Sequence, residues 1–354
     1  VYKRQLLDYL FLPMINYLLI GLFMNIAFPE IPAWVFVVAS IALVTVLNVV
    51  GISQVAGMSN VIVGAQLVFI VVFVIMSIKT LAGGAAIDFS LPFVGDGTQP
   101  GFAPLMAGAA VLCLSFLGFD AVSTMAEETR DARRDIPRAI IITTVIAGLM
   151  FTLLAIISQL VFPGSVFQNA DSAANEVMLK AGGQFLGNFF TSAYIAGCIG
   201  SALASQASVS RIIFTMGRDG ILPRSLFGTL HARFQTPVVA ILVVSAISLL
   251  AVVLDLTTLA SMISFGALVA FSVVNLAVIR TYLGVERRRG AKNVLLYGAI
   301  PFIGLCLTLW LWTSLSQMTL IVGLSWFAVG FAYLAVHTGG FRRKAPSVNF
   351  EENA

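Results

Sequence analysis

Two aspartates lie inside apolar stretches of this sequence. A charged carboxylate in such a stretch needs an explanation other than exposure to solvent. Asp120 lies in "SFLGFDAVSTMAEE" and Asp8 lies in "LLDYLFLPMINYLL". An aspartate at the centre of a membrane helix costs about 2.5–3.5 kcal/mol. Such a carboxylate either binds a cation or proton, or is hydrogen-bonded to a neighbouring helix or hydrated near an interface. Both interpretations stay open, and the first makes Asp8 and Asp120 candidate ligands for a cationic substrate.

The surroundings of Asp120 predict an interrupted helix. Gly118 lies two residues upstream, and the hydroxyl residues Ser115, Ser123 and Thr124 flank the carboxylate. Glycine weakens a helix by about 1 kcal/mol relative to alanine, and hydroxyls satisfy backbone groups that a break sets free. Transporters bind their substrates at such breaks near the bilayer midplane. The alternative is that Gly118 only lets a neighbouring helix pack closely.

Further candidates for binding lie on two other apolar runs. Tyr9 follows Asp8 at about 100° around a helix, so the two could line adjacent sectors of one cavity. A tyrosine beside a carboxylate suits an ammonium ligand, whereas a tyrosine near a membrane end also serves as an interfacial anchor. In "GSALASQASVSR", Ser205 and Ser208 are candidate ligands for a coupling cation. The alternative for this run of small residues is close helix packing.

The composition defines the class of protein that holds these residues. The chain has 354 residues, of which 59% are hydrophobic and 10% charged, and its mean hydropathy is +0.99. Soluble proteins are about 25% charged, so a polytopic membrane protein is predicted. Its three cysteines and two histidines show no spacing for disulfides or a metal site. No nucleophile–base pair or phosphate loop is visible, so we expect neither an enzyme nor a cofactor.

Apolar runs long enough to span a bilayer recur along the chain. A span needs about 20 apolar residues, and the runs are too long and too uniform for membrane strands. The sequence therefore predicts an all-α protein with ten transmembrane helices. The ten runs are 6–27, 33–50, 58–78, 103–126, 139–162, 184–208, 237–254, 258–279, 295–314 and 319–337.

The distribution of Lys and Arg predicts the orientation. With a cytoplasmic N-terminus, all 20 basic residues except Lys79 and Lys180 fall on the cytoplasmic side. The basic pI of about 9.1 is thus a topology signal and gives no reason to expect a nucleic-acid partner. We expect a multi-pass membrane protein with both ends of the chain cytoplasmic. Residues 1–338 would form one transmembrane domain and 339–354 a cytoplasmic tail, with long outer loops near 79–102 and 163–183.

Three stretches of the chain resemble the amino acid–polyamine–organocation permeases. "SFLGFDAVSTMAEETRDARRDIPRAI" looks like the sixth helix and following loop of that family. "ASVSRIIFTMGRDGILPRSLFGTLHARFQTP" looks like the end of the eighth helix and its cytoplasmic loop, and "LLDYLFLPMINYLL" looks like the third helix. Within the family the chain is most similar to bacterial putrescine importers, and the resemblance runs along nearly all of it.

The resemblance implies a broken-helix fold of two inverted five-helix repeats, with twelve helices when complete. This chain fits helices three to twelve, so the first two would be absent. Ser115, Phe116 and Gly118 match the unwound part of the sixth helix, and Phe116 matches the region of the aromatic gate. Asp120 matches an acidic position common in the family, also in members that carry neutral amino acids, so it does not by itself indicate a polyamine substrate. Gln66 falls where many proton-coupled members carry a lysine, a departure that favours a cationic substrate.

The function implied is secondary active import of a small organic amine, putrescine or a related polyamine, by alternating access. Asp120, Asp8, Tyr9, Phe116, Ser115 and Gly118 would contact the substrate, and Ser205, Ser208 and Gln66 are candidates for coupling-ion binding. The alternatives are an amino acid permease of the same superfamily and, from another class, a non-transporting membrane sensor. The expected partners are the amine or amino acid, a coupling proton and the lipid bilayer, with the protein a monomer or homodimer.

Overall fold

The computed structural model describes residues 2–51, 55–83, 88–94, 105–106, 108–109, 112–116, 118, 129, 131–164, 166–286, 290–313, 315 and 317–337. For residues 2–9, 55–59 and some positions near 113 and 330, only the backbone is described. All regular structure in this part of the chain is helical. In lipid each backbone N–H and C=O must be satisfied within the protein, and a helix does so within one segment.

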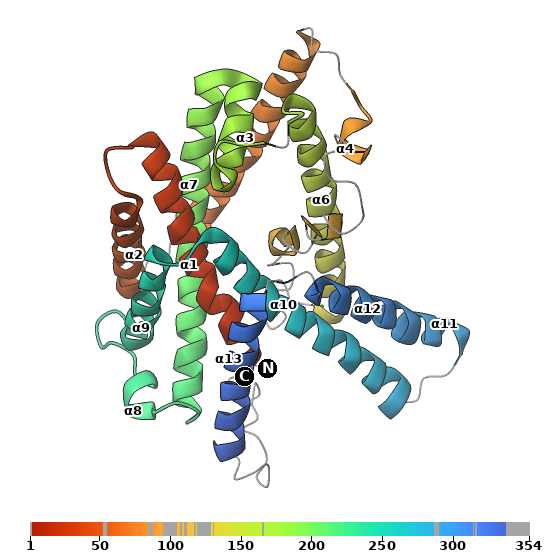
Figure 1. The fold of residues 1–354 in the computed structure, drawn as a ribbon. Coiled ribbons are helices and arrows are strands. Elements are labelled where there is room, and N and C mark those ends of the chain that lie inside the picture. The colour runs from red at the N-terminus through yellow and green to blue at the C-terminus, as the bar shows by residue number, and fades with distance from the viewer. Residues whose placement is uncertain are drawn as a thin grey trace. The chain divides into compact units, whose positions relative to one another are not determined.

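The described helices follow one another along the chain as Figure 1 shows. The long ones are α1 (Tyr2–Ala27), α2 (Ala33–Val50), α3 (Val55–Ala82), α6 (Ala132–Val161), α7 (Ala173–Arg218), α9 (Val238–Ser248), α10 (Leu256–Ile279), α12 (Ile300–Trp312) and α13 (Gln317–His337). The short ones are α4 (Leu91–Val94), η1 (Cys113–Phe116), η3 (Ala170–Ser172), α8 (Arg224–Phe227), η4 (Leu249–Val252) and α11 (Ala291–Val294). Two π-helical turns, η5 (Arg280–Val285) and η6 (Leu295–Ala299), flank the connection into α12.

Seven helical stretches of the described chain are long and apolar enough to cross a membrane, which confirms a polytopic membrane protein. They are Leu10–Ala27, Ala33–Val50, Asn60–Ala82, Ala132–Val161, Ala170–Arg218, Leu256–Val285 and Ala291–Trp312. The predicted run 237–254 corresponds to the shorter apolar helix Val238–Val252. The run 319–337 corresponds to α13, which is outside the seven, and most of 103–126 lies outside the described residues. The count of ten and the inverted repeat stay predictions.

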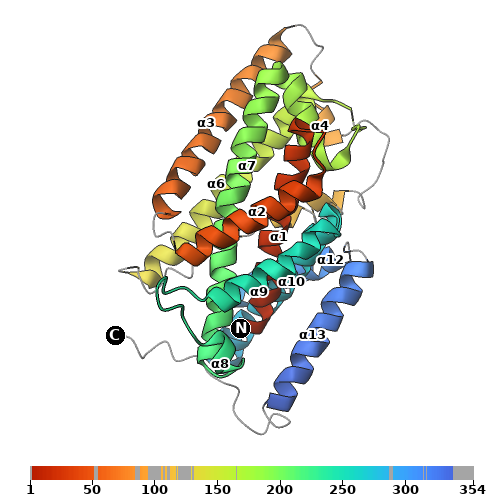
Figure 2. The same cartoon turned by 90° about the vertical axis from the view of Figure 1, so that its left-hand side faces the viewer.

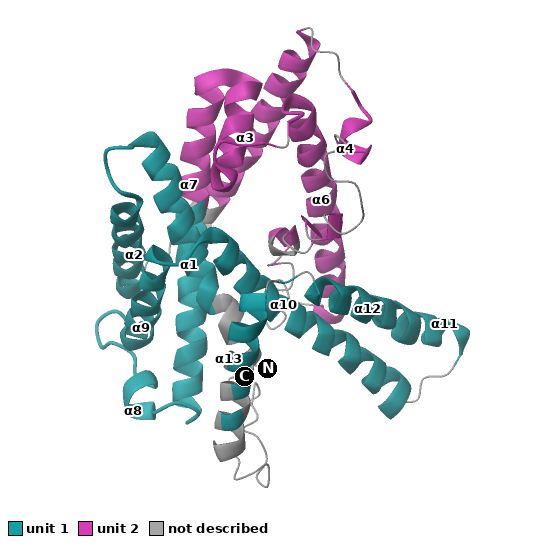
Figure 3. Cartoon of the chain, in the orientation of Figure 1, with its two compact units in different colours: residues 1–56, 198–354 teal, residues 57–197 magenta. Residues whose placement is uncertain are grey.

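The chain divides into two compact units, coloured separately in Figure 3. Unit 1 comprises Val1–Ala56 and Cys198–Ala354, and unit 2 comprises Gly57–Gly197. The division falls inside α7, so the N-terminal part of this helix belongs to unit 2 and its C-terminal part to unit 1. The prediction that residues 1–338 form a single transmembrane domain concerns both units together and stays a prediction.

The core of unit 1 forms around α1. This helix packs against α2 and α10, and α2 packs in turn against α9 (Figure 2). Met14 and Tyr17 of α1 are fully buried. Gly21 permits the close approach of α2, because a Cβ there would lie 2.5 Å from Val37 Cγ2 and 3.0 Å from the Ala33 carbonyl oxygen. Small residues at such contacts allow helix backbones to come together in a bilayer.

In unit 2, one face of α3 packs in antiparallel register on the N-terminal part of α7. Phe69 of α3 lies 5.6 Å, centroid to centroid, from Phe190. Farther along, Thr80 Oγ1 donates a hydrogen bond of 2.6 Å to the carbonyl of Ala181. That bond satisfies a carbonyl beside a break in α7, where Gly183 takes φ 63° and ψ −161°. Residues 173–181, expected within an outer loop, therefore form a separate helical segment before the membrane-crossing part of α7.

Asp255 caps the N-terminus of α10. Its carboxylate accepts hydrogen bonds from the Thr258 hydroxyl and, at 2.9 Å, from the Thr258 backbone N–H. The Thr258 side chain, and then its N–H, hold the pKa of Asp255 below its ordinary value. A carboxyl group whose pKa is lower in the folded protein stabilises the fold above its unfolded pKa. That contribution is lost as the pH falls through the folded value.

We expect Asp255→Ala to lower the unfolding free energy by about 1 kcal/mol near pH 6, because it removes the N-cap. Asp255→Asn keeps a cap acceptor and should unfold close to the wild type at that pH. Thermal unfolding in detergent between about pH 6 and pH 3 measures both effects. Wild-type protein should lose more stability on acidification than Asp255→Asn, and equal losses would contradict a native-state role for the ionised cap.

Candidate functional site

The segment of unit 2 predicted to interrupt a helix is not α-helical where it is described. Residues 113–116 form the 3₁₀ turn η1, and Gly118 has φ +109°. An L-residue with a Cβ rarely adopts this conformation. Ser115 and Gly118 are exposed, whereas Phe116 is half-buried. Asp120, the carboxylate expected to mark this site, lies outside the described residues.

Phe116 packs on α6. Its ring stands edge-on to Phe151 at a centroid separation of 5.6 Å. The same ring lies against Gly148, where a Cβ would come 3.6 Å from Phe116 Cε1. Edge-to-face geometry at this distance is a favourable aromatic contact. Contacts with α6 thus hold the Phe116 ring in place.

Gln66, also in unit 2, lies against the backbone of α7. A Cβ built at Gly197 would collide with the Gln66 amide nitrogen, so a larger residue at 197 would require the end of this side chain to shift. Gln66 is half-buried and stands on the same face of α3 as Phe69 and Phe73. The position therefore carries a neutral amide packed in a helix–helix contact.

The remaining sequence-predicted residues belong to unit 1. Asp8 and Tyr9 lie in α1, of which only the backbone is described here. Ser205 Oγ donates a 2.7 Å hydrogen bond to the carbonyl of Ser201, and Ser208 Oγ donates one of 2.9 Å to Ala204. Because both hydroxyl protons are used within α7, only their oxygen lone pairs are available to a cation. The structure thus places Asp8, Tyr9, Ser205 and Ser208 in one unit, and Ser115, Phe116, Gly118 and Gln66 in the other.

A buried polar cluster in unit 1 escaped the sequence analysis. Gln206 of α7 is fully buried and accepts hydrogen bonds from Tyr17 Oη at 3.3 Å and Asn48 Nδ2 at 2.9 Å. Its own amide nitrogen donates to Ser245 Oγ at 2.6 Å. Thr45 Oγ1 lies 2.6 Å from the same Ser245 oxygen. The sequence shows carboxamide side chains in otherwise apolar runs. It does not show which groups they would hydrogen-bond.

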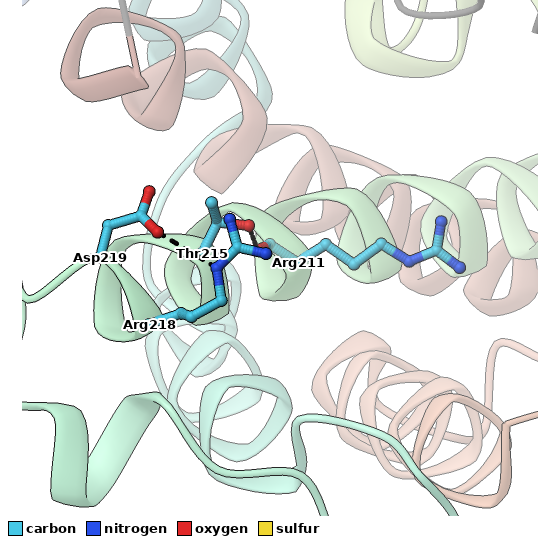
Figure 4. Close-up of polar contacts among 4 residues, drawn as sticks. All are labelled: Arg211, Thr215, Arg218 and Asp219. Carbon is cyan, nitrogen blue, oxygen red and sulfur yellow. Dashed lines mark hydrogen bonds and ion pairs between the residues drawn. The ribbon is translucent and has the colours of Figure 1, made fainter. Parts of the chain in front are cut away.

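The C-terminal end of α7 is basic (Figure 4). Arg218 Nε pairs with Asp219 at 3.1 Å, and both side chains are partly exposed. One turn earlier, Thr215 Oγ1 donates a 2.9 Å hydrogen bond to the carbonyl of Arg211. Cations are favoured at helix C-termini, and an exposed pair such as Arg218–Asp219 contributes little to stability. This end of α7 therefore has the character of a helix leaving the hydrocarbon at a solvated interface.

Comparison with known proteins relates these features to a family. The family model for amino acid permeases matches residues 5–341. The chain is 39% identical to the low-affinity putrescine importer PlaP of Escherichia coli (strain K12), over 97% of this chain and 76% of that protein. It is 27% identical to the branched-chain amino acid permease BcaP of Bacillus subtilis (strain 168), over 87% of this chain and 65% of that protein.

A further match, over less of the chain, is the vacuolar cationic amino acid transporter 4 of Arabidopsis thaliana. It is 28% identical to this chain over 68% of the chain and 39% of that protein. These matches confirm the predicted resemblance. The family and these relatives are permeases and transporters, so the expectation that the chain is not an enzyme is confirmed as well.

Gly118→Ala tests the importance of the backbone in the 115–118 segment. None of the described residues lies within 4 Å of the added methyl, so the expected effect comes from φ +109°. A strained residue of this kind costs about 1–3 kcal/mol, and we expect the uptake rate to fall about ten-fold or more. Gly108→Ala is the matched control, because its Cβ also meets open space and its φ is not positive. Equal uptake by the two variants would show that the Gly118 conformation is dispensable.

Proposed function

Since the chain belongs to the amino acid permease family, we propose that it imports a small organic amine, putrescine first, by alternating access. The observation that carries this proposal is the 39% identity to a putrescine importer over 97% of the chain. The acidic residues inside apolar runs support it, because a diamine with two ammonium groups needs anionic partners in a medium of low dielectric.

The substrate site that we propose combines a carboxylate, an aromatic ring and a helix break. Asp120 pairs with one ammonium group, and Tyr9 and Phe116 provide aromatic faces for cation–π contact. Asp8 is the second anionic contact or a proton acceptor. Ser115 and the backbone around Gly118 supply polar groups beside the break. The support for the Phe116 ring on α6 and the positive φ of Gly118 agree with this arrangement.

The positive charge of the substrate determines the driving force for its uptake. A cation enters with the inside-negative potential, which is worth about 2.3 kcal/mol per charge per 100 mV. A cotransported proton would add to it, and Ser205, Ser208 and Gln66 are the residues proposed to contact a coupling ion. Gln66 is neutral and packed against Gly197. It therefore adds no positive charge that would repel an amine, as a lysine would.

We propose that the chain is a multi-pass protein of the inner membrane and that both of its ends are cytoplasmic. The basic end of α7, with Arg211 and Arg218, and the segment carrying Arg224 and Arg233 would then face the cytoplasm. Ten spans in an inverted repeat, forming one transmembrane domain over residues 1–338, complete the proposed architecture. The seven apolar helical stretches and the additional helix α13 support it.

The second candidate function is amino acid permeation, favoured by the similarity to BcaP over 87% of the chain. An amino acid presents a carboxylate as well as an ammonium group. The carboxylate would need backbone N–H donors at helix breaks, which transporters place near the midplane. The 3₁₀ turn at residues 113–116 would supply some of these donors.

Competition for uptake separates the two substrates. In proteoliposomes with an inside-negative potential, unlabelled putrescine at about ten times its KM should reduce the uptake of labelled putrescine about ten-fold. Leucine, alanine and arginine at the same concentration should leave it unchanged. Liposomes without protein give the background. If labelled putrescine is not taken up above this background, and a labelled amino acid is taken up in a way that putrescine does not inhibit, the second proposal replaces the first.

Asp120→Asn tests the proposed anionic contact. Removing one partner of a desolvated charge pair costs about 2–5 kcal/mol, so the KM for putrescine should rise at least about ten-fold. The control is Asp88→Asn, which alters an exposed carboxylate that the Ser90 side chain and N–H hydrogen-bond. If Asp120→Asn leaves both the KM and the pH dependence of uptake unchanged, Asp120 has a structural role only.

A further inference from the structure

The Gln206 carboxamide links four helices of unit 1. Its oxygen accepts from Tyr17 of α1 and Asn48 of α2, and its nitrogen donates to Ser245 of α9. Gln206 itself stands on α7 with no exposed surface. One side chain thus holds α1, α2 and α9 to α7 through three directional contacts.

The donors and acceptors of this cluster fit one orientation of the amide. The oxygen end of Gln206 meets two donors, and the nitrogen end meets a hydroxyl oxygen. Ser245 Oγ donates at 2.8 Å to the carbonyl of Ile241, so its lone pairs are available for the Gln206 N–H. Thr45 Oγ1 lies 2.6 Å from the Ile41 carbonyl oxygen and 2.6 Å from Ser245 Oγ, and its single proton serves one of these two contacts at a time. A buried amide that is hydrogen-bonded at both its oxygen and its nitrogen favours one arrangement of its neighbours.

A second polar contact joins α1 to α7 next to the first. Asn16 Nδ2 donates to the carbonyl of Leu12 at 2.7 Å and to Ser201 Oγ at 3.1 Å. Asn16 precedes Tyr17 in α1, so two successive residues of this helix are hydrogen-bonded to α7. Ser205, a candidate ion ligand, lies on α7 between Ser201 and Gln206.

These contacts determine how α1 is rotated and shifted against α7. In lipid no hydrophobic force selects between apolar helix faces, so packing and interhelical hydrogen bonds set the register. A one-residue slip would rotate every side chain of α1 by about 100°. Asp8 and Tyr9 stand about two helical turns before Asn16 and Tyr17 on the same helix. Their position relative to Ser205 and Ser208 therefore depends on the Gln206 cluster.

We propose that Gln206 is a positioning residue for transport, which fixes the α1 side of the substrate site against α7. The proposal rests on the proposed function in one respect, namely that α1 contributes to the site. Gln206 does not touch the substrate. It acts through Tyr17 and α1, so its loss should weaken substrate binding beyond any effect on folding.

The experiment compares Gln206→Met, Tyr17→Phe and the double variant in proteoliposomes. Methionine is close to glutamine in size but cannot form these bonds, and phenylalanine removes only the Tyr17 hydroxyl. We expect the KM to rise about five-fold or more for Gln206→Met and about three-fold for Tyr17→Phe, the equivalent of one buried hydrogen bond. The double variant should resemble Gln206→Met, because the two changes remove a shared contact.

The control is Gln184→Met, which changes an exposed glutamine of α7 bonded to Asn188 at 2.8 Å. It should leave the KM unchanged. If Gln206→Met does not fold, the KM of Tyr17→Phe by itself tests the proposal. A KM equal to the wild type in Tyr17→Phe, or multiplicative effects in the double variant, would overturn the proposal. A lower melting temperature with an unchanged KM would also overturn it.

The labelled compound is whichever amine or amino acid the wild type carries in the competition assay. The proposal that the substrate is putrescine and the proposal that Gln206 positions α1 can therefore be rejected independently. Wild-type uptake of an amino acid in place of putrescine rejects the substrate, while the response of its KM to Gln206→Met still tests the positioning role.

Discussion

Hydrogen bonding to the buried Gln206 amide joins four helices of unit 1. Within the bilayer, apolar side chains gain little from meeting one another instead of lipid tails. The contacts that distinguish one helix arrangement from another are then close packing and polar groups that find partners only in that arrangement. Gly21 permits the close packing of α1 and α2. The polar contacts are those of Gln206 with Tyr17, Asn48 and Ser245.

The same constraint governs the places where helices stop being regular. A break frees backbone groups that lipid cannot satisfy, so each break needs local polar support. At Gly183 the Thr80 hydroxyl satisfies the carbonyl of Ala181. Residues 113–116 form the tight turn η1, and Gly118 has a positive φ. Such breaks are also where a transporter exposes backbone dipoles to a substrate, which links the folding constraint to the proposed function.

The comparisons and the structure contribute differently to the functional conclusion. Similarity along 97% of the chain to a putrescine importer establishes the family and the permease class. The structure adds the support of Phe116 by α6, the neutral packing of Gln66 and the hydroxyl bonds of Ser205 and Ser208. These details restrict what each residue can do chemically. The two serines, for example, retain only oxygen lone pairs for a coupling cation.

The sequence by itself determined the class, the positions of most spans and the unusual stretch around Gly118, because these follow from composition and local backbone preference. Apolar length predicts a membrane helix wherever it occurs, and glycine beside polar residues predicts an irregular turn. The Gln206 cluster and the helical segment at 173–181 were decided only by the tertiary structure. Tyr17, Asn48, Gln206 and Ser245 lie far apart in sequence, and a carboxamide in an apolar run has no intrinsic partner. Which donors and acceptors it meets depends on how α1, α2, α7 and α9 pack.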